Sequence, residues 1–186
     1  MKTTEMVGMV GLGNMGHPIA LNLVEAGYRV VGYEVDENRW KPTDQLSYVT
    51  DLEALANKTS VILLSLPDGS AVQEVIGKLL TLNAKNTLAV VDTSTIGAKA
   101  SQAIGRSVRN TGLEYLDSPV SGGVRGAVAG TLAVMCAGSK NLYSSVLPIL
   151  TTFTANQFLI GPQAGQAQTV KVLNNFLSAT ALAASC

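Results

Sequence analysis

A glycine-rich turn between two apolar runs near the N-terminus is the feature that most constrains the fold of this chain. Residues 6–10 form a short apolar run typical of a buried strand, and Gly11-Leu-Gly-Asn-Met-Gly16 follows at once. A helical pattern covers 19–24, and a second strand pattern covers 29–33 and ends before Glu34. This order of strand, glycine turn, helix and strand predicts a doubly wound, mostly parallel α/β sheet.

The residues of the turn match the requirements of a dinucleotide site. Gly11 permits a tight turn, Gly13 lets the backbone approach a pyrophosphate, and Gly16 lets the helix pack closely on the strand. The N–H groups at the helix start favour phosphate oxygens. We therefore expect the cofactor to contact the whole turn, comprising Gly11, Leu12, Gly13, Asn14, Met15 and Gly16. The alternative interpretation is an ordinary turn of an α/β protein.

Glu34 follows the second strand pattern, about twenty residues after the turn, where a carboxylate accepts hydrogen bonds from the ribose 2′-OH. The same carboxylate would repel a 2′-phosphate, because both groups are negatively charged. The sequence therefore predicts that NAD is preferred over NADP.

Further strand patterns alternate with helical patterns, which favours a parallel sheet with helices on both faces. Residues 36–50 are less regular, and we assign no strand there. Strand patterns occupy 60–65, 88–92, 113–117, 131–136 and 157–160, and helical patterns lie at 71–80, 98–109 and 139–150.

Two loops follow these strands at the edge where ligands bind in open α/β sheets. Leu66-Pro67 follows one strand pattern, and Thr93-Ser94-Thr95 follows the next. We expect both loops to face the cofactor. For Ser94 and Thr95 an equally good alternative is that their hydroxyls cap the helix at 98–109.

The segment 118–130 contains four glycines in nine residues, which fits no regular element, so we expect a loop. Its N–H groups are suited to hold one anion, such as a substrate carboxylate, and Arg125 would add a positive charge. The alternative is a flexible hairpin.

A turn at Gly161–Gly165 opens a long helical pattern that carries Lys171. Asn174 and Asn175 follow at i+3 and i+4 and share its helical face. No acidic residue lies within four positions of Lys171. We expect the rest of the chain to bring a cofactor and a small substrate to this lysine.

Composition excludes several classes of protein. The 186 residues favour one domain, or one domain and part of another, and the formal charge is zero, which argues against nucleic acid or an anionic membrane as partner. Cys136 and Cys186 do not make a disulfide framework, and a single histidine, His17, gives no metal site. No apolar run is long enough to span a bilayer, so we expect a cytoplasmic protein.

Three stretches together, 11–18, 117–132 and 161–175, resemble the β-hydroxyacid dehydrogenase family, which includes 3-hydroxyisobutyrate dehydrogenase and 6-phosphogluconate dehydrogenase. The motifs occur in the family's order along nearly the whole chain. The resemblance implies a Rossmann-type NAD(P)-binding domain over 1–162 and the start of an interdomain helix over 163–186. It also implies that a C-terminal helical domain is missing here and that the full-length form is a homo-oligomer.

The resemblance further implies an oxidoreductase that transfers a hydride between NAD and the β-hydroxyl carbon of a small hydroxy acid similar to 3-hydroxyisobutyrate. The alternative is a truncated, non-catalytic NAD-binding module or a regulatory or scaffold protein. The implied catalytic residues are Lys171, as general acid/base, and Asn175. The implied binding residues are Ser121, Gly122, Gly123 and Asn174 for the substrate, and Glu34, Leu66, Pro67 and Thr95 for the cofactor in addition to the glycine turn.

Overall fold

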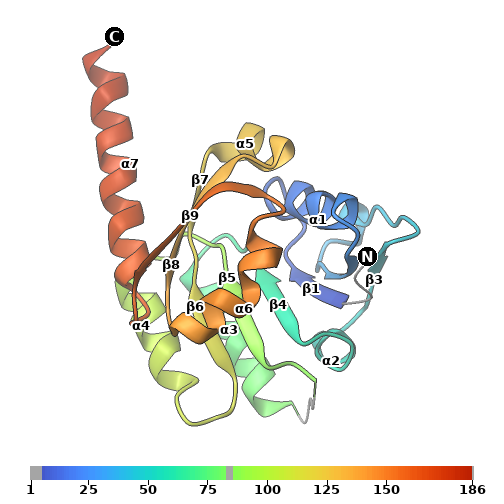
Figure 1. The fold of residues 1–186 in the computed structure, drawn as a ribbon. Helices are drawn as coiled ribbons and strands as arrows, with labels where there is room; N and C mark the ends of the chain where they lie inside the picture. Colours follow the sequence, from blue (N-terminus) through green and yellow to red (C-terminus); the bar gives the residue numbers. More distant parts are fainter. Residues whose placement is uncertain (1–5, 83–85, 186) are drawn as a thin grey trace.

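A mostly parallel sheet runs through the centre of the computed structural model, which describes residues 6–82 and 86–185 (Figure 1). Its strand order is β3-β2-β1-β4-β5-β6-β8-β7, and β9 pairs with β8. The strands are β1 (Met6–Val10), β2 (Arg29–Tyr33), β3 (Leu46–Tyr48), β4 (Val61–Leu64), β5 (Ala89–Asp92), β6 (Glu114–Asp117), β7 (Val120–Ser121), β8 (Leu132–Ala137) and β9 (Thr154–Gly161). The helices are α1 (Gly16–Glu25), η1 (Glu37–Arg39), α2 (Leu52–Ala56), α3 (Gly69–Thr81), α4 (Ala98–Ser107), α5 (Gly123–Ala129), α6 (Lys140–Leu150) and α7 (Gln166–Ala184).

Helices cover both faces of the sheet, which confirms the doubly wound fold class. Alternate residues of a strand point to opposite faces, so Val7 and Met9 of β1 pack with α1 and α6, while Val10 packs with α2, α3 and α4. The same division separates Leu63 from Leu64 in β4. Two apolar cores therefore enclose the sheet. The central strands β1, β4 and β5 are buried on both faces, as in parallel sheets covered by helices, whereas β9 is largely exposed.

The last residues of five parallel strands lie in register. Val10 is paired with Tyr33 on one side and with Leu64 on the other, and the row continues through Asp92 to Asp117. The residues that follow these strands therefore leave the sheet at one common edge. In open α/β sheets this edge is where ligands bind.

The expectation that 118–130 holds no regular element is wrong, because α5 forms over Gly123–Ala129. Gly122 and Gly130, with φ of 129° and 66°, make the turns before and after this helix. The helix packs against α1, where the Asn22 side-chain amide donates a hydrogen bond to the Ala127 carbonyl over 2.7 Å. Tertiary contact with α1 thus stabilises a helix that local composition disfavours.

The sequence interpretation also missed β3, three residues at the edge of the sheet beside β2. Leu46 is fully buried, and the Tyr48 ring stacks on the Trp40 ring with centroids 5.3 Å apart. A strand this short shows too few alternations to be recognised from its pattern.

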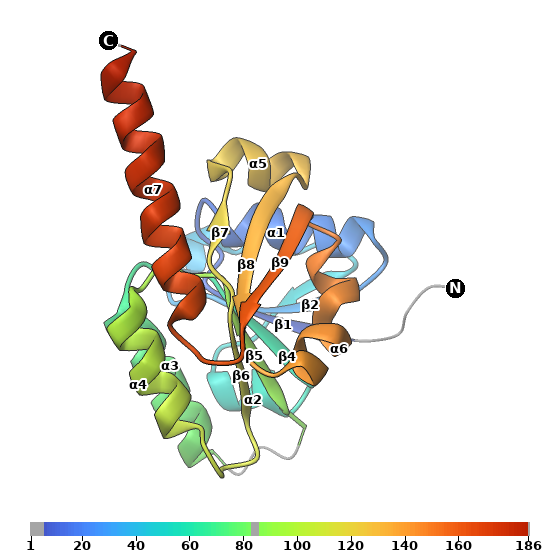
Figure 2. The same ribbon diagram turned by 60° about the vertical axis from the view of Figure 1, so that its left-hand side comes forward.

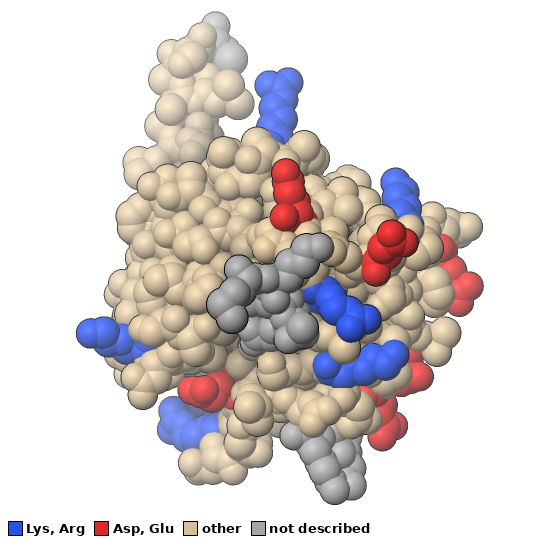
Figure 3. Space-filling model, turned by 45° about the vertical axis from the view of Figure 1, so that its right-hand side comes forward, with Lys and Arg blue, Asp and Glu red and all other residues tan. Residues whose placement is uncertain are grey.

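Helix α7 starts against α4, β6 and β8 and then projects away from the body of the molecule (Figures 1 and 2). Its projecting part exposes the apolar side chains Val172, Leu173, Phe176, Leu177 and Leu182. Across the described ranges 6–82 and 86–185, no helix combines the length and hydropathy required to cross a membrane. On the face drawn in Figure 3, acidic and basic side chains are interspersed.

Two carboxyl groups, those of Asp92 and Asp117, are buried side by side at the ends of β5 and β6. Burial raises the pKa of Asp92 to about 6, against opposing hydrogen bonds from Ser94 and Tyr115. The folded protein therefore binds this proton more tightly than the unfolded chain does. The resulting stabilisation is present below pH 4 and is lost as the pH rises to about 6.

The substitution Asp92→Asn removes this titration while keeping the side-chain shape. As the pH rises from 4 to 7, wild type loses this stabilisation and the variant does not. The free energy of unfolding of the variant minus that of wild type should therefore increase by about 3 kcal/mol, since one pKa unit corresponds to ~1.4 kcal/mol. Urea unfolding across this pH range measures the difference. The exposed Asp44→Asn serves as the control and should show no such gain, and a constant difference for Asp92→Asn would contradict the assignment.

Candidate functional site

A cavity of about 700 Å³ opens at the carboxyl edge of the sheet, beside the glycine turn. Helix α3 forms its far wall through Ala71, Glu74 and Lys78. Most of the predicted cofactor residues line it, namely Gly11, Gly13, Asn14, Met15, Glu34, Leu66 and Pro67. Leu12 and Gly16 lie beneath the lining, both buried. The structure therefore brings the turn, the acid and the β4 loop together around one space.

Two glycines of the turn occupy positions where a side chain would collide with backbone. A Cβ atom on Gly16 would lie 1.9 Å from the Gly11 carbonyl oxygen, and one on Gly11 would lie 2.3 Å from the Ser65 carbonyl oxygen. By contrast, the nearest atom to a Cβ on Gly13 is Nη1 of Arg39 at 3.3 Å. No side chain caps α1, so the N–H groups at its start have no side-chain acceptor. These observations fit a pyrophosphate at the turn.

The Glu34 carboxylate holds the glycine turn to the end of β2. Its Oε2 accepts a hydrogen bond from the Leu12 N–H over 2.8 Å, and its Oε1 accepts one from the Asp36 N–H over 3.1 Å. Nη1 of the exposed Arg39 lies 4.0 Å from Oε2. The side chain is only 7% exposed, and it lines the cavity. Glu34 therefore shapes the turn as well as facing the space beside it.

The loop after β5 is joined to the loop after β4. The Leu66 N–H donates a hydrogen bond to the Ser94 hydroxyl oxygen over 2.9 Å. The alternative in which Ser94 or Thr95 caps the following helix is wrong. The N-cap residue of α4 is Gly97, and no side-chain hydrogen bond is made there by the N-cap residue. Thr95 is exposed beside this junction.

Lys171 is 7% exposed although it carries an amine. Burial lowers the pKa of its ammonium group below the usual 10.5. Among the described residues no carboxylate lies within ion-pair distance of it. A buried lysine without a counter-ion gives up its proton more readily than a solvated one.

Asn174 links the Lys171 helix to the predicted substrate segment. Its side-chain amide donates a hydrogen bond to the Ser121 hydroxyl oxygen over 3.0 Å. Gly122, Gly123 and Asn175 are exposed, and so is Arg125. The structure thus places Ser121 beside α7 and leaves the surface around it open on one side.

Sequence reasoning missed the polar residues that hold these parts together, chiefly Gln168, Asp117 and Asp92. All three are fully buried. Asp92 and Asp117 could have been noticed, since each ends an apolar run at the carboxyl edge of the sheet. Gln168 gave no comparable signal, because a glutamine in a helical pattern is usually solvent-exposed.

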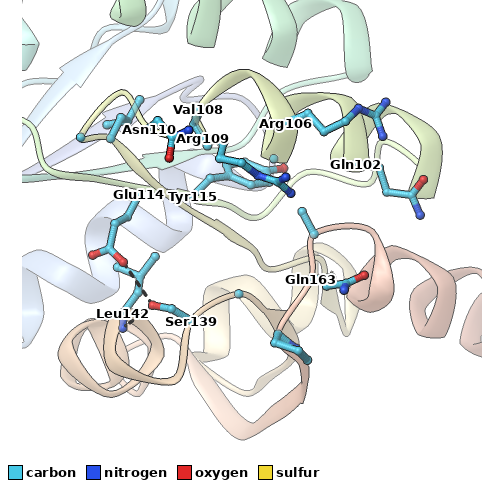
Figure 4. A pocket seen from close by; sticks show the side chains of 16 residues that line it. Gln102, Arg106, Val108, Arg109, Asn110, Glu114, Tyr115, Ser139, Leu142 and Gln163 are labelled. Carbon is cyan, nitrogen blue, oxygen red and sulfur yellow. Dashed lines mark hydrogen bonds between the residues drawn. The ribbon is translucent and has the colours of Figure 1, made fainter.

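A second cavity of about 590 Å³ lies between the end of α4 and the start of α6 (Figure 4). Arg106, Arg109 and Gln163 line it, and the Ser139 hydroxyl donates a hydrogen bond to Glu114 at its wall. None of the residues predicted to bind cofactor or substrate lines this cavity.

The described residues, 6–82 and 86–185, contain one thiol and no cluster of potential metal ligands. No group of three or more His, Cys, Asp and Glu side chains is placed to hold a metal ion in residues 6–82 and 86–185. Cys136 is a buried free thiol, and burial raises its pKa to about 11. Cys186 lies outside the described residues.

Comparison with known proteins gives a consistent result. Residues 6–161 match the family model described as the NAD binding domain of 6-phosphogluconate dehydrogenase. An uncharacterised oxidoreductase of Synechocystis is 34% identical over 179 residues, covering 92% of this chain and 61% of that protein. The 2-(hydroxymethyl)glutarate dehydrogenase of Eubacterium barkeri is 29% identical, with coverage of 95% and 60%.

The solved structure of Mycobacterium tuberculosis 3-hydroxyisobutyrate dehydrogenase with L-serine superposes with a TM-score of 0.87 at 29% identity. It covers 95% of this chain, which in turn covers 61% of that one. The chain thus spans 53–61% of the length of the curated relatives it matches. The match over 6–161, the glycine turn and the fold agree, and we conclude that the chain belongs to the family of the 6-phosphogluconate dehydrogenase NAD-binding domain, among the relatives of 3-hydroxyisobutyrate dehydrogenase.

Proposed function

We propose that this chain is the NAD-binding part of a dehydrogenase that oxidises the β-hydroxyl of a small hydroxy acid, or runs the reverse reduction. The observation that carries the proposal is the buried Lys171, which has no counter-ion among the described residues and lies one helical turn from the Asn174–Ser121 hydrogen bond. The family supplies the cofactor class, and the relatives' names supply the substrate class. The nicotinamide of the bound cofactor would accept or supply the hydride.

The role of Lys171 follows from its protonation. Oxidation of a hydroxyl releases one proton from the substrate oxygen, and the neutral amine of Lys171 accepts it. In the reverse direction the ammonium form returns that proton to the carbonyl oxygen. A lowered pKa makes the neutral form accessible, and positioned proton transfer of this kind typically contributes ~10²–10⁴ in rate.

Ser121 and the N–H groups of Gly122 and Gly123 are the proposed binding site for the substrate carboxylate. Ser121 is held next to α7 by Asn174, so a carboxylate bound there lies near the helix that carries Lys171. Asn175 follows as an exposed amide that would contact the substrate. A charged acid is the substrate class that such N–H donors favour.

We assign residues 1–162 to the cofactor domain and 163–186 to the start of an interdomain helix, in an enzyme whose full-length form is a homo-oligomer. The exposed Gly122, Gly123 and Asn175 leave one side of the substrate region uncovered within the described residues. This openness favours a second candidate for the chain by itself, a module that binds NAD(P) without turnover.

Substitution of Lys171 tests the proposed chemistry. In the product of the complete gene, Lys171→Met should lower kcat for a small β-hydroxy acid by ~10²–10⁴, because no group replaces the amine. The oxidation rate of wild type should rise with pH up to the Lys171 pKa, below 10.5, and the variant should lose this limb. Absorbance at 340 nm follows both. Lys140→Met, at an exposed lysine, is the control, and equal activity of the two variants would refute the role.

Cofactor preference is tested at Glu34. Wild type should bind NADH more tightly than NADPH, since the buried carboxylate repels a 2′-phosphate. Glu34→Gln keeps an acceptor for the Leu12 N–H and should reduce this preference about tenfold, or ~1.4 kcal/mol. Arg39→Gln should strengthen the preference for NADH, because the Arg39 guanidinium, 4.0 Å from Oε2 of Glu34, is a cation that would attract a 2′-phosphate.

Fluorescence titration with both reduced cofactors measures these affinities and needs no turnover. Glu37→Gln, an exposed acid on the adjacent η1, is the matched control and should leave the ratio unchanged. Tighter binding of NADPH than NADH by wild type would overturn the preference for NAD.

A further inference from the structure

Gln168 is the most completely bonded buried side chain of α7, and the proposed chemistry does not use it. It lies three residues before Lys171, on the same face of the helix, and is fully buried. A buried side-chain amide is costly unless both its oxygen and its nitrogen find partners. Those partners therefore show what the residue does.

The oxygen end of the amide binds the loop between β5 and α4. Oε1 accepts hydrogen bonds from the Ile96 N–H over 3.0 Å and from the Gly97 N–H over 3.1 Å. These N–H groups precede α4, whose own end offers no side-chain cap. Gln168 therefore holds, from a neighbouring helix, the two residues that precede α4. These residues follow Thr95, which the sequence predicts to contact the cofactor.

The nitrogen end binds the loop after β5 and the last residue of β6. Nε2 donates to the Ser94 carbonyl oxygen over 3.0 Å and to Oδ1 of Asp117 over 2.8 Å. Oδ2 of Asp117 in turn accepts from the Gly165 N–H over 2.8 Å and from the Gln168 N–H over 3.4 Å. A carboxylate at the start of a helix is favoured by the helix dipole. The first turn of α7 is thus tied to both β6 and the loop after β5.

From this geometry we infer that Gln168 is a positioning residue that fixes Lys171 relative to the cofactor loop at 94–97 and the substrate segment after Asp117. The inference rests on the proposed function for the role of Lys171. Lys171 is less than one helical turn beyond Gln168, so any shift of that turn moves the amine. Ser118, next after Asp117, starts the segment that reaches Ser121, and so one amide couples both halves of the site.

A merely structural role would predict a different pattern of effects. If Gln168 only contributed to global stability, its loss would loosen every element and leave the Lys171 environment in the folded molecule unchanged. If it positions α7, its loss should loosen the loop at 94–97 and hydrate Lys171 while the sheet stays intact. The two cases can be separated without cofactor or substrate.

The test compares Gln168→Met, which removes the amide but keeps the chain length, with Gln163→Met at an exposed glutamine just before the helix. Lysine labelled with ¹³C at Cε gives the Lys171 pKa by NMR titration, assigned with Lys171→Arg. Amide hydrogen exchange compares Ile96 and Gly97 with Val91 in β5. If Gln168→Met does not fold, Gln168→Asn, one methylene shorter, replaces it.

In the Gln168 variant the Lys171 pKa should rise toward 10.5, and exchange at Ile96 and Gly97 should accelerate about tenfold for the lost hydrogen bonds, with Val91 unchanged. The control should match wild type in both readouts. An unchanged Lys171 pKa, or equal acceleration at Val91, overturns the inference. A lack of dehydrogenase activity would affect only the proposed function, because neither readout depends on turnover.

Discussion

The buried carboxylate of Asp117 determines how α7 lies on the sheet. An isolated charge in such a place would cost several kcal/mol, and only a full set of hydrogen bonds makes it tolerable. Its two oxygens receive bonds from the Gly165 N–H and from both the backbone and the side chain of Gln168. The carboxylate therefore requires the start of α7 in one orientation. Everything the helix carries, including Lys171, depends on that requirement.

A second buried carboxylate, that of Glu34, also has two roles at this edge of the sheet. The Glu34 carboxylate that is expected to select the cofactor also accepts the Leu12 N–H, so it fixes the shape of the turn. The register that aligns Val10, Tyr33 and Leu64 brings these groups to one line. Cofactor selection and turn geometry therefore cannot vary independently, because one side chain contributes to both.

The sequence predicted those features that arise from local pattern. The glycine turn, the alternation of strands and helices, and the long helix with Lys171 each carry their own signal in neighbouring residues. Helix α5 and strand β3 do not, because packing on α1 and pairing with β2 stabilise them. The contacts of Gln168 join residues more than fifty positions apart, and a single sequence contains no measure of such proximity. The roles of the site residues remain predictions.

The length of α7 gives its attachment a mechanical consequence. About 24 Å of helix separates Gln168 from Ala184 at ~1.5 Å per residue, whereas Lys171 lies only ~4.5 Å along the axis. A tilt of ~5° about the anchored turn would thus displace the far end by ~2 Å and the lysine by ~0.4 Å at this rise. The helix acts as a lever with its short arm in the site. A displacement of its distal, exposed part therefore reaches Lys171 reduced about fivefold, so the lysine backbone moves little when the far end of the helix moves.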